Sequence, residues 1–194
     1  MAWGKAGSTT LESNSAEINV TMTSSNFNQF MVNAIANGTV DSQMRLGYNS
    51  NDSGQNYSVR QSYNGGADGS GSVDQTAIDV GVGGLDDDCF HIGYFANFNG
   101  EPKLFSEKLC HSYGTGQHEI LREIVGAKWD NTNQANRIQY RESHSGTDTH
   151  ITSDSNLSVL GSDEVLYVVQ DGAIFYETDT NKSYVLNSGT WTEL

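Results

Sequence analysis

Residues 46–66 read LGYNSNDSGQNYSVRQSYNGG. The stretch is rich in Asn, Ser and Gly, carries an aromatic residue every few positions and shows no helical period. Residues of this kind hold turns and short strands through hydrogen bonds between side chains and the local backbone. Residues 51–54 are a strong turn signal, and Tyr57 and Val59 alternate with polar residues as in a strand. The stretch therefore predicts a strand, a turn and a second short strand in a β protein.

The composition of the 194 residues agrees with this class. Hydrophobic residues make up 36% of the chain and charged residues 18%, and Gly, Ser, Thr and Asn fill much of the remainder. Low charge together with many turn-forming residues is typical of a β protein and not of a charged disordered tail. The length suits one domain, or one domain with a small appendage.

The charge balance argues against two classes of partner. The formal net charge is −14, with only 10 Lys and Arg. Such a chain repels phosphate backbones and anionic lipids, so we expect it to bind neither nucleic acid nor a membrane. No apolar run is long enough for a transmembrane helix, and the N-terminus lacks the apolar core of a signal peptide. We therefore expect synthesis in a cytoplasm.

Alternation of apolar and polar residues predicts about nine to eleven short strands between residues 17 and 161. Ile18, Val20 and Met22 are a clear example. Residues 27–35 fit a helical spacing as well as an alternation, and we favour a strand because the neighbouring segments are β-like. Residues 119–129 are compatible with a helical turn that leads into a strand. The number of strands and the spacing of turns predict an all-β fold, an antiparallel β-sandwich or jelly roll.

Two segments flank the predicted sandwich domain. Residues 1–16 have no period and predict an N-terminal arm, whose Trp3 packs either on its own domain or on a neighbouring subunit. Residues 162–194 are denser in Val, Tyr and Phe and contain several turn signals, which predicts a small C-terminal β-meander. Such a unit buries too little surface to be stable alone. Four of its aromatic residues are therefore expected at an interface with the main domain or another chain: Phe175, Tyr176, Tyr184 and Trp191.

Residues 89–110 predict a β-hairpin around Asn99-Gly100, since Asn-Gly is the strongest short hairpin signal. With a two-residue turn, Cys89 lies opposite Cys110 at a position where side chains approach closely. An oxidising medium would then permit a disulfide between them. Two facts oppose the bond. A proline such as Pro102 often introduces a bulge, which breaks this register, and thiols of proteins made in a cytoplasm usually stay reduced.

Other clusters of reactive residues have simpler explanations. Residues 86–88 are three aspartates without the alternating spacing of a calcium loop, and they fit a solvated turn. Zinc-type ligands occur at Cys89, His91, Cys110 and His111. Adjacent strand residues point to opposite faces, so these four side chains do not converge. No motif singles out a nucleophile or a catalytic pair of carboxylates. We therefore expect no metal site, no cofactor and no enzymatic activity.

The loops between residues 48 and 63 are the one candidate binding site. Aromatic faces stack on sugar rings, and side-chain amides bond to sugar hydroxyls. The candidate residues for a glycan or an interface are Tyr48, Asn51, Asp52, Asn56, Tyr57 and Tyr63. The alternative, which we prefer, is that the polar residues of the turn and Tyr57 simply fix one strand against the sheet.

Four motifs follow one another along the chain. They are NSNDSGQNY at residues 49–57, CFHIGYFANFNGEPKLF at 89–105, KWDNTNQANRIQY at 128–140 and SDSNLSVLGSD at 153–163. This order resembles a β-sandwich domain common in structural proteins of tailed phages, particularly marine ones. The resemblance covers about residues 27–163, and residues 172–191 resemble short β modules of phage fibre and capsid-appendage proteins. It implies a virion protein and brings no catalytic residues with it.

The residues and the resemblance together predict a structural protein of a phage virion. We expect an outward-facing appendage or capsid decoration, made in the host cytoplasm, that forms a homo-oligomer (a trimer by analogy) and docks on capsid or tail proteins. The alternative is a glycan-binding fibre or adhesin module that recognises the host. A hydrolase of surface polysaccharide is a third hypothesis, for which no catalytic constellation emerges.

Overall fold

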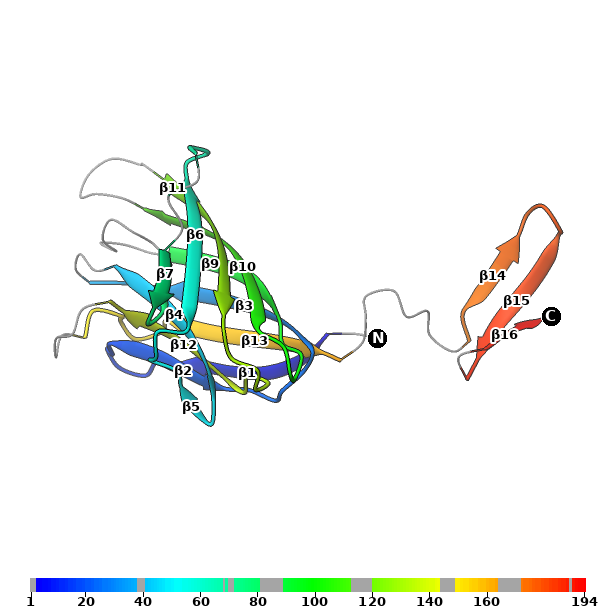
Figure 1. The fold of residues 1–194 in the computed structure, drawn as a ribbon, viewed down its shortest axis with the longest axis horizontal. Coiled ribbons are helices and arrows are strands. Elements are labelled where there is room, and N and C mark those ends of the chain that lie inside the picture. Colours follow the sequence, from blue (N-terminus) through cyan, green and yellow to red (C-terminus); the bar gives the residue numbers. More distant parts are fainter. Residues whose placement is uncertain are drawn as a thin grey trace.

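The structure is a computed structural model, and it describes residues 3–37, 41–67, 69, 72–80, 89–112, 120–143, 149–163, 172–188 and 190–194. Two antiparallel sheets pack against each other as a β-sandwich, and a small third sheet follows (Figure 1). The predicted all-β fold is confirmed. In the part of the chain described, no helix is long and apolar enough to cross a membrane.

The larger sheet has eight strands in the order β1-β13-β3-β9-β10-β11-β6-β7. They are β1 (Gly4–Thr10), β3 (Phe27–Ala34), β6 (Tyr57–Tyr63), β7 (Ser72–Gln75), β9 (Cys89–Ala96), β10 (Lys103–Ser112), β11 (Ile120–Trp129) and β13 (Asn156–Ser162). The β9–β10 hairpin forms the centre of the sheet. Most neighbours in this order are distant in sequence, so the sheet joins the two ends of the domain.

The smaller sheet has five strands, in the order β2-β12-β4-β5 with β8 also paired to β4. They are β2 (Glu17–Thr21), β4 (Ser42–Tyr48), β5 (Ser50–Asn51), β8 (Ile78–Val80) and β12 (Arg137–Glu142). The third sheet is the meander β14 (Ile174–Glu177), β15 (Lys182–Asn187) and β16 (Thr190–Glu193).

Three segments with open alternatives are settled by these pairings. Residues 27–34 form a strand, so the strand interpretation of that segment is right. Residues 120–129 form a strand along their whole length, without a helical turn. Residues 4–10 pair with β13 at the edge of the larger sheet, so they belong to the sandwich and do not form an arm that leaves it.

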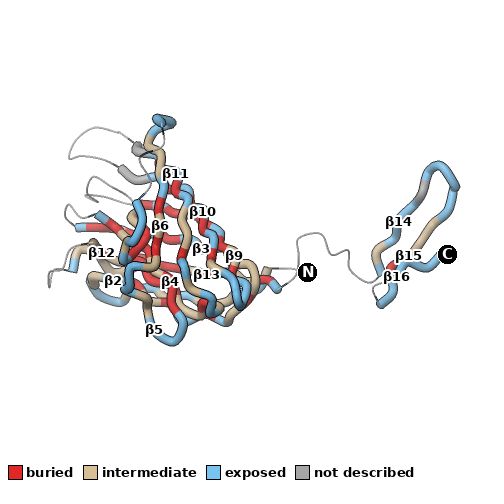
Figure 2. Tube along the Cα trace, viewed as in Figure 1, coloured by how far each residue is buried: buried red, intermediate tan, exposed pale blue. Residues whose placement is uncertain are grey.

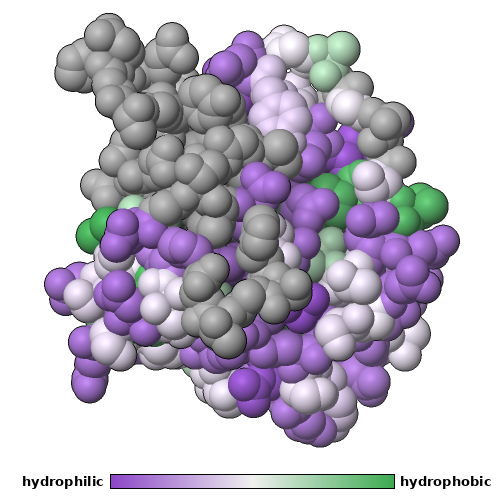
Figure 3. Space-filling model, turned by 90° about the vertical axis from the view of Figure 1, so that its left-hand side faces the viewer, coloured by the Kyte–Doolittle hydropathy of each residue, from purple (hydrophilic) through white to green (hydrophobic). Residues whose placement is uncertain are grey.

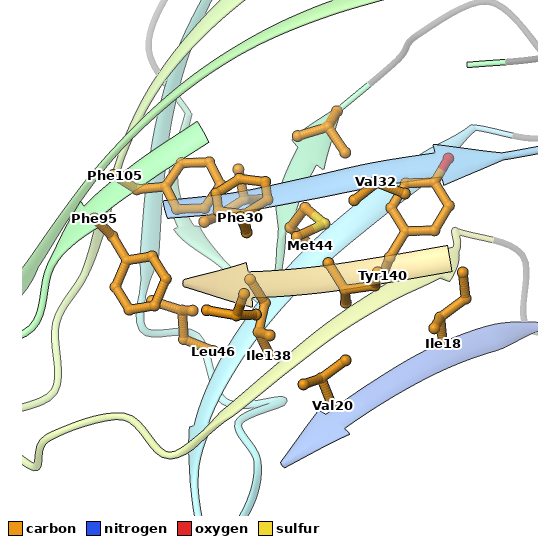
Figure 4. Packing of buried hydrophobic residues seen from close by; sticks show 14 of the residues in the cluster. Ile18, Val20, Phe30, Val32, Met44, Leu46, Phe95, Phe105, Ile138 and Tyr140 are labelled. Atoms are coloured by element: carbon orange, nitrogen blue, oxygen red, sulfur yellow. The ribbon is translucent and has the colours of Figure 1, made fainter. Parts of the chain in front are cut away.

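The core lies between the inner faces of the two sheets, where Figure 2 shows the buried residues gathered. Phe30, Phe95 and Phe105 from the larger sheet are at most 4% exposed and face the smaller sheet (Figure 4). Their partners from the smaller sheet include Ile18, Val20, Met44, Leu46, Ile138 and Tyr140. Alternation of buried and exposed residues along each strand produces this arrangement, because successive side chains of a strand point to opposite faces.

The hairpin between β9 and β10 differs from the prediction. Residues 97–102 separate the two strands, in place of a two-residue turn, and the pairing is shifted by one residue. Cys89 therefore lies opposite His111 and not opposite Cys110. Cys89 is buried, Cys110 is exposed, and both are free thiols. The possible disulfide between them is absent from this structure, because a shift of one residue moves a side chain to the other face of the sheet.

Two buried polar side chains hold this longer turn. Asn97 donates from Nδ2 to the carbonyls of Ser25 and Ala135, at 3.0 and 2.9 Å, and its Oδ1 accepts from the Ala135 amide at 2.7 Å. The Lys103 ammonium donates to the carbonyl of Phe98 at 2.7 Å. Because buried polar groups require such partners, these two residues fix where β9 ends and β10 begins.

The C-terminal meander is a sheet of its own, to which no described strand of the sandwich is paired. Its register places Phe175, Tyr184, Leu186 and Trp191 on one face. The ring centroid of Phe175 lies 6.3 Å from that of Tyr184 and 6.0 Å from that of Trp191. On this face Leu186 is buried, but Phe175 and Trp191 remain exposed, and Tyr176 is exposed on the opposite face. The single chain therefore leaves most of this apolar surface open.

Gly93 on β9 makes room for the aromatic ring of Phe30 on the inner face. It lies opposite Phe30 in the ladder, and a Cβ added at Gly93 would lie only 2.2 Å from the Phe30 ring. The Phe30 ring in turn stacks on that of Phe105, with 5.1 Å between the centroids. A side chain at position 93 would push these rings apart at the centre of the sandwich.

We predict that Gly93→Ala lowers the free energy of unfolding by about 1–3 kcal/mol, because it overpacks the core. Urea unfolding followed by tryptophan fluorescence measures the change. Gly126→Ala is the matched control on β11, two strands away in the same sheet: its Cβ would meet nothing closer than the Arg60 carbonyl at 4.0 Å. Equal effects of the two substitutions would contradict the explanation.

Candidate functional site

Asp52 ties together the loop that follows β5 and the end of β11. Its Oδ2 accepts hydrogen bonds from Trp129 Nε1 at 2.7 Å and from Asn56 Nδ2 at 3.0 Å. Its Oδ1 accepts from the Gly54 amide at 2.8 Å. Partial burial alone would raise the pKa of Asp52, but these hydrogen bonds, with that of Trp129 the strongest, lower it below its usual value. Asp52 is therefore a fixed carboxylate that holds the loop.

Tyr57 lies beneath this loop and connects the two sheets. Its hydroxyl donates to the Leu46 carbonyl at 2.9 Å and accepts from the Leu46 amide at 3.1 Å. Its ring stacks on Trp129 with an angle of 18° between the ring planes. Tyr57 is fully buried, and this burial raises the pKa of its hydroxyl. It is part of the core and presents no surface to a ligand.

A polar hollow of about 390 Å³ opens above Asp52. It is lined by Tyr48, Ser50, Asn51, Asp52, Ser53, Gly54, Asn56, Trp129, Asn131 and Asn133. Tyr48 is 49% exposed and presents its ring at this surface. The hollow thus has an aromatic side chain and several amides, which is the chemistry that suits a sugar.

The structure brings together four of the six predicted binding residues, namely Tyr48, Asn51, Asp52 and Asn56. Tyr63 lies at the far end of β6, opposite Glu123 in the ladder, and is not part of the hollow. Its pKa is raised by burial and by the charge of Glu123. Three lining residues that the sequence did not suggest are Trp129, Asn131 and Asn133. Their signal was present in the motif KWDNTNQ, but only the fold places that motif beside residues 48–56.

A second polar cluster lies inside the core. His91 bonds through Nδ1 to Glu107 Oε1 at 2.6 Å, and its Nε2 lies 3.2 Å from Cys89 Sγ. The Tyr140 hydroxyl lies 3.2 Å from the same sulfur. Burial alone would lower the pKa of His91, but Cys89 and Glu107 raise it to about 10. The imidazole is therefore a protonated group held between two acceptors.

The order thiol, imidazole, carboxylate is also that of a nucleophile, its base and an orienting group. Here Cys89, His91 and Glu107 are each at most 1% exposed, so a substrate does not reach them in this conformation. The cluster instead joins β9 and β10 to β12, because Tyr140 comes from the smaller sheet. Among the described residues, no group of His, Cys, Asp and Glu is arranged to hold a metal ion. Residues 86–88 lie outside the described residues.

The predicted interface residue Trp3 lies in a second, apolar hollow. It lines a groove of about 650 Å³ on the larger sheet, together with Phe27, Tyr94 and Leu104 among others. Trp3 is therefore placed on its own domain. The other predicted interface residues, Phe175, Tyr176, Tyr184 and Trp191, all belong to the meander.

A scan against protein-family models, a search of curated proteins and a search of solved structures each returned no match. The site is therefore interpreted from its own geometry.

The raised pKa of His91 predicts a pH-dependent stability. The folded state holds the proton of His91 more tightly than the unfolded state does, so protonation stabilises the fold. This stabilisation is complete below about pH 6.5, the usual pKa of histidine, and it is lost as the pH rises toward 10. Between about pH 6.5 and 9.5, we expect the free energy of unfolding to fall more in the wild type than in His91→Gln, by about 1–3 kcal/mol. Urea unfolding at a series of pH values measures both slopes.

His150→Gln is the control for this experiment. His150 also contacts a glutamate, Glu142, at 3.1 Å, but its side chain is partly exposed. The slope of this variant shows how much a histidine–glutamate contact outside the buried cluster contributes. Identical slopes for the wild type and His91→Gln would contradict the assignment of the proton to the buried cluster.

Proposed function

We propose that the protein is a structural component of a tailed-phage virion, an outward-facing appendage or capsid decoration that acts by assembly. The observation that carries the proposal is the contrast between a closed interior and open apolar surfaces. The thiol of Cys89, the imidazole of His91 and the carboxylate of Glu107 are sealed in the core. Phe175, Tyr176 and Trp191 of the meander are exposed. Such surfaces are typical of proteins that dock on others.

The phage-like motifs support the proposal through what their residues do. Asp52 and Trp129, from two of the motifs, bond to each other and hold the loop above the core. Asn97 and Lys103, from a third, hold the β9–β10 turn. A structural domain needs these residues whatever it binds, which explains a shared order of motifs without a shared active site.

The acidic charge fits the same role. A net charge of −14 favours solubility, and it disfavours non-specific binding to nucleic acid. We propose that the chain is made in the host cytoplasm and joins the particle as a homo-oligomer on capsid or tail proteins, using its sheet surfaces for contact.

Mass spectrometry of purified particles tests this function. We expect peptides of the chain in virions at a constant copy number relative to the major capsid protein, through successive density gradients. Its absence from particles, with the chain present in the infected-cell lysate, would overturn the proposal.

A glycan-binding module is the second candidate, and the polar hollow favours it. Tyr48 offers an exposed ring, and Asn51, Asn131 and Asn133 offer amides around the Asp52 carboxylate. Asp52 and Tyr57 hold the fold, so their substitution does not separate binding from stability. Tyr48 is the residue to test, because it lies at the surface.

On a glycan array, the glycan-binding function predicts that Tyr48→Ala weakens binding about tenfold or more through loss of ring stacking. Tyr48→Phe is the matched control, since it keeps the ring and removes only the hydroxyl. The variants should share the unfolding midpoint of the wild type. An array without any bound glycan would reject this candidate and leave the assembly function in place.

A further inference from the structure

The outer face of the eight-stranded sheet is an uncovered apolar surface. Alternate residues of β3, β9, β10 and β11 point away from the core on this side. Five large apolar side chains there are between 41% and 64% exposed: Met31, Phe90, Tyr94, Leu104 and Ile124. The register places Met31, Ile92 and Ile124 in one row across the sheet, with Lys108 between the last two. The surface is thus continuous and not a set of scattered residues.

The groove lined by Trp3, Phe27, Tyr94 and Leu104 deepens one end of this face. Its volume of about 650 Å³ exceeds that of several large side chains, so the groove has room for apolar side chains of a partner. On the side of the molecule drawn in Figure 3, hydrophilic residues dominate and hydrophobic colour gathers mainly in one patch near the right-hand edge.

The charge of the outer face is opposite to that of the chain. Arg60, Lys108 and Arg122 project from outward positions of β6, β10 and β11. In the described parts of β3, β6, β9, β10, β11 and β13, no acidic residue occupies an outward position. A chain of net charge −14 therefore presents an apolar face bordered by positive charge. Such a face selects a partner that is apolar and acidic.

The C-terminal meander has both properties. Its apolar face consists of Phe175, Tyr184, Leu186 and Trp191. Residues 172–194 contain three acidic residues, Glu177, Asp179 and Glu193, and a single basic one, Lys182. A three-stranded sheet of this size needs a surface to cover it, because it buries too little of its own. The meander and the outer face therefore complement each other in polarity and in charge.

We propose that the meander of one copy of this chain docks, by its Phe175–Trp191 face, on the outer face of the eight-stranded sheet of a second copy. Phe175 and Trp191 of the meander and the five large side chains of the outer face are exposed in the single chain, so both surfaces are open to a partner. The docked pair is two sheets packed face to face, the packing that also forms the sandwich.

The path of the chain suits such an exchange. β13, which leads to the meander, ends at Ser162 opposite Phe27, at the rim of the groove. The intervening residues 164–171 span at most about 28 Å when extended. Two copies whose grooves lie side by side can therefore each give a meander and receive one, which closes the assembly. The inference deepens the assembly function proposed above and rests on it only for its place in a particle.

Sedimentation velocity of the purified full chain provides the first test. We expect a concentration-dependent oligomer that weakens as salt rises, because charge contributes to the contact. Trp191→Ser on the meander and Leu104→Glu on the outer face should each raise the dissociation constant about tenfold or more. Tyr48→Ser, an equally exposed aromatic position outside both surfaces, should leave the dissociation constant unchanged.

A mixing experiment separates a second copy from the chain's own meander. One protein carries Phe175→Ser and Trp191→Ser with an intact outer face, and the other carries Tyr94→Glu and Leu104→Glu with an intact meander. Each should be monomeric alone, and the two together should form a one-to-one complex. Circular dichroism and unfolding midpoints near those of the wild type establish that both variants fold.

Two results would overturn the proposal. One is a wild-type chain that stays monomeric at about 100 μM in low salt, well above the dissociation constant of a specific contact. The other is a pair of variants that fail to associate on mixing. Either result would leave the virion function standing if the chain is found in particles. Conversely, an oligomer that forms as expected would support the docking proposal even if the chain proved absent from phage particles.

Discussion

The register of the β9–β10 hairpin determines which side chains of the central strands face the core. A shift of one residue in an antiparallel pair exchanges the two faces of a strand. The observed register buries Phe105 and Leu109 of β10 and places Lys108 and Cys110 outside. Since β3 and β11 pair with these two strands, their contributions to the core depend on the same choice. Both the interior and the open outer face follow from it.

Buried polar side chains fix the strand pairing at one end of the larger sheet, where Lys103 of β10 pairs with Trp129 of β11. Asn97 and Lys103 bond to backbone groups around the β9–β10 turn. At the loop above the core, Asp52 bonds to Trp129 and Asn56. A buried donor or acceptor without a partner is costly, so these side chains tolerate one arrangement of the loops. The polar residues thus supply the specificity that a purely apolar core lacks.

The division between closed interior and open surface shapes the functional interpretation. Cys89, His91 and Glu107 have reactive chemistry but no access, so they contribute to stability and its pH dependence. The outer face and the meander have access but little reactive chemistry, and they suit contact with proteins. The hollow beside Tyr48 is polar and shallow, and it suits a small hydrophilic ligand. These surfaces are built from different side chains, so each of their roles can be changed separately.

The sequence by itself determined the class of fold, because alternation and turn signals are local. It placed strands at residues 18–22 and 27–34 and marked Asp52 as a turn residue. It also identified the meander and its aromatic residues. The sequence did not show that Cys110 is exposed, that Lys103 is buried or that Asp52 contacts Trp129. Each depends on pairing between distant segments, and a strand pattern shows that one face is buried without showing what covers it. Only the tertiary structure decided which strands are neighbours, in which register they pair and which apolar faces stay open.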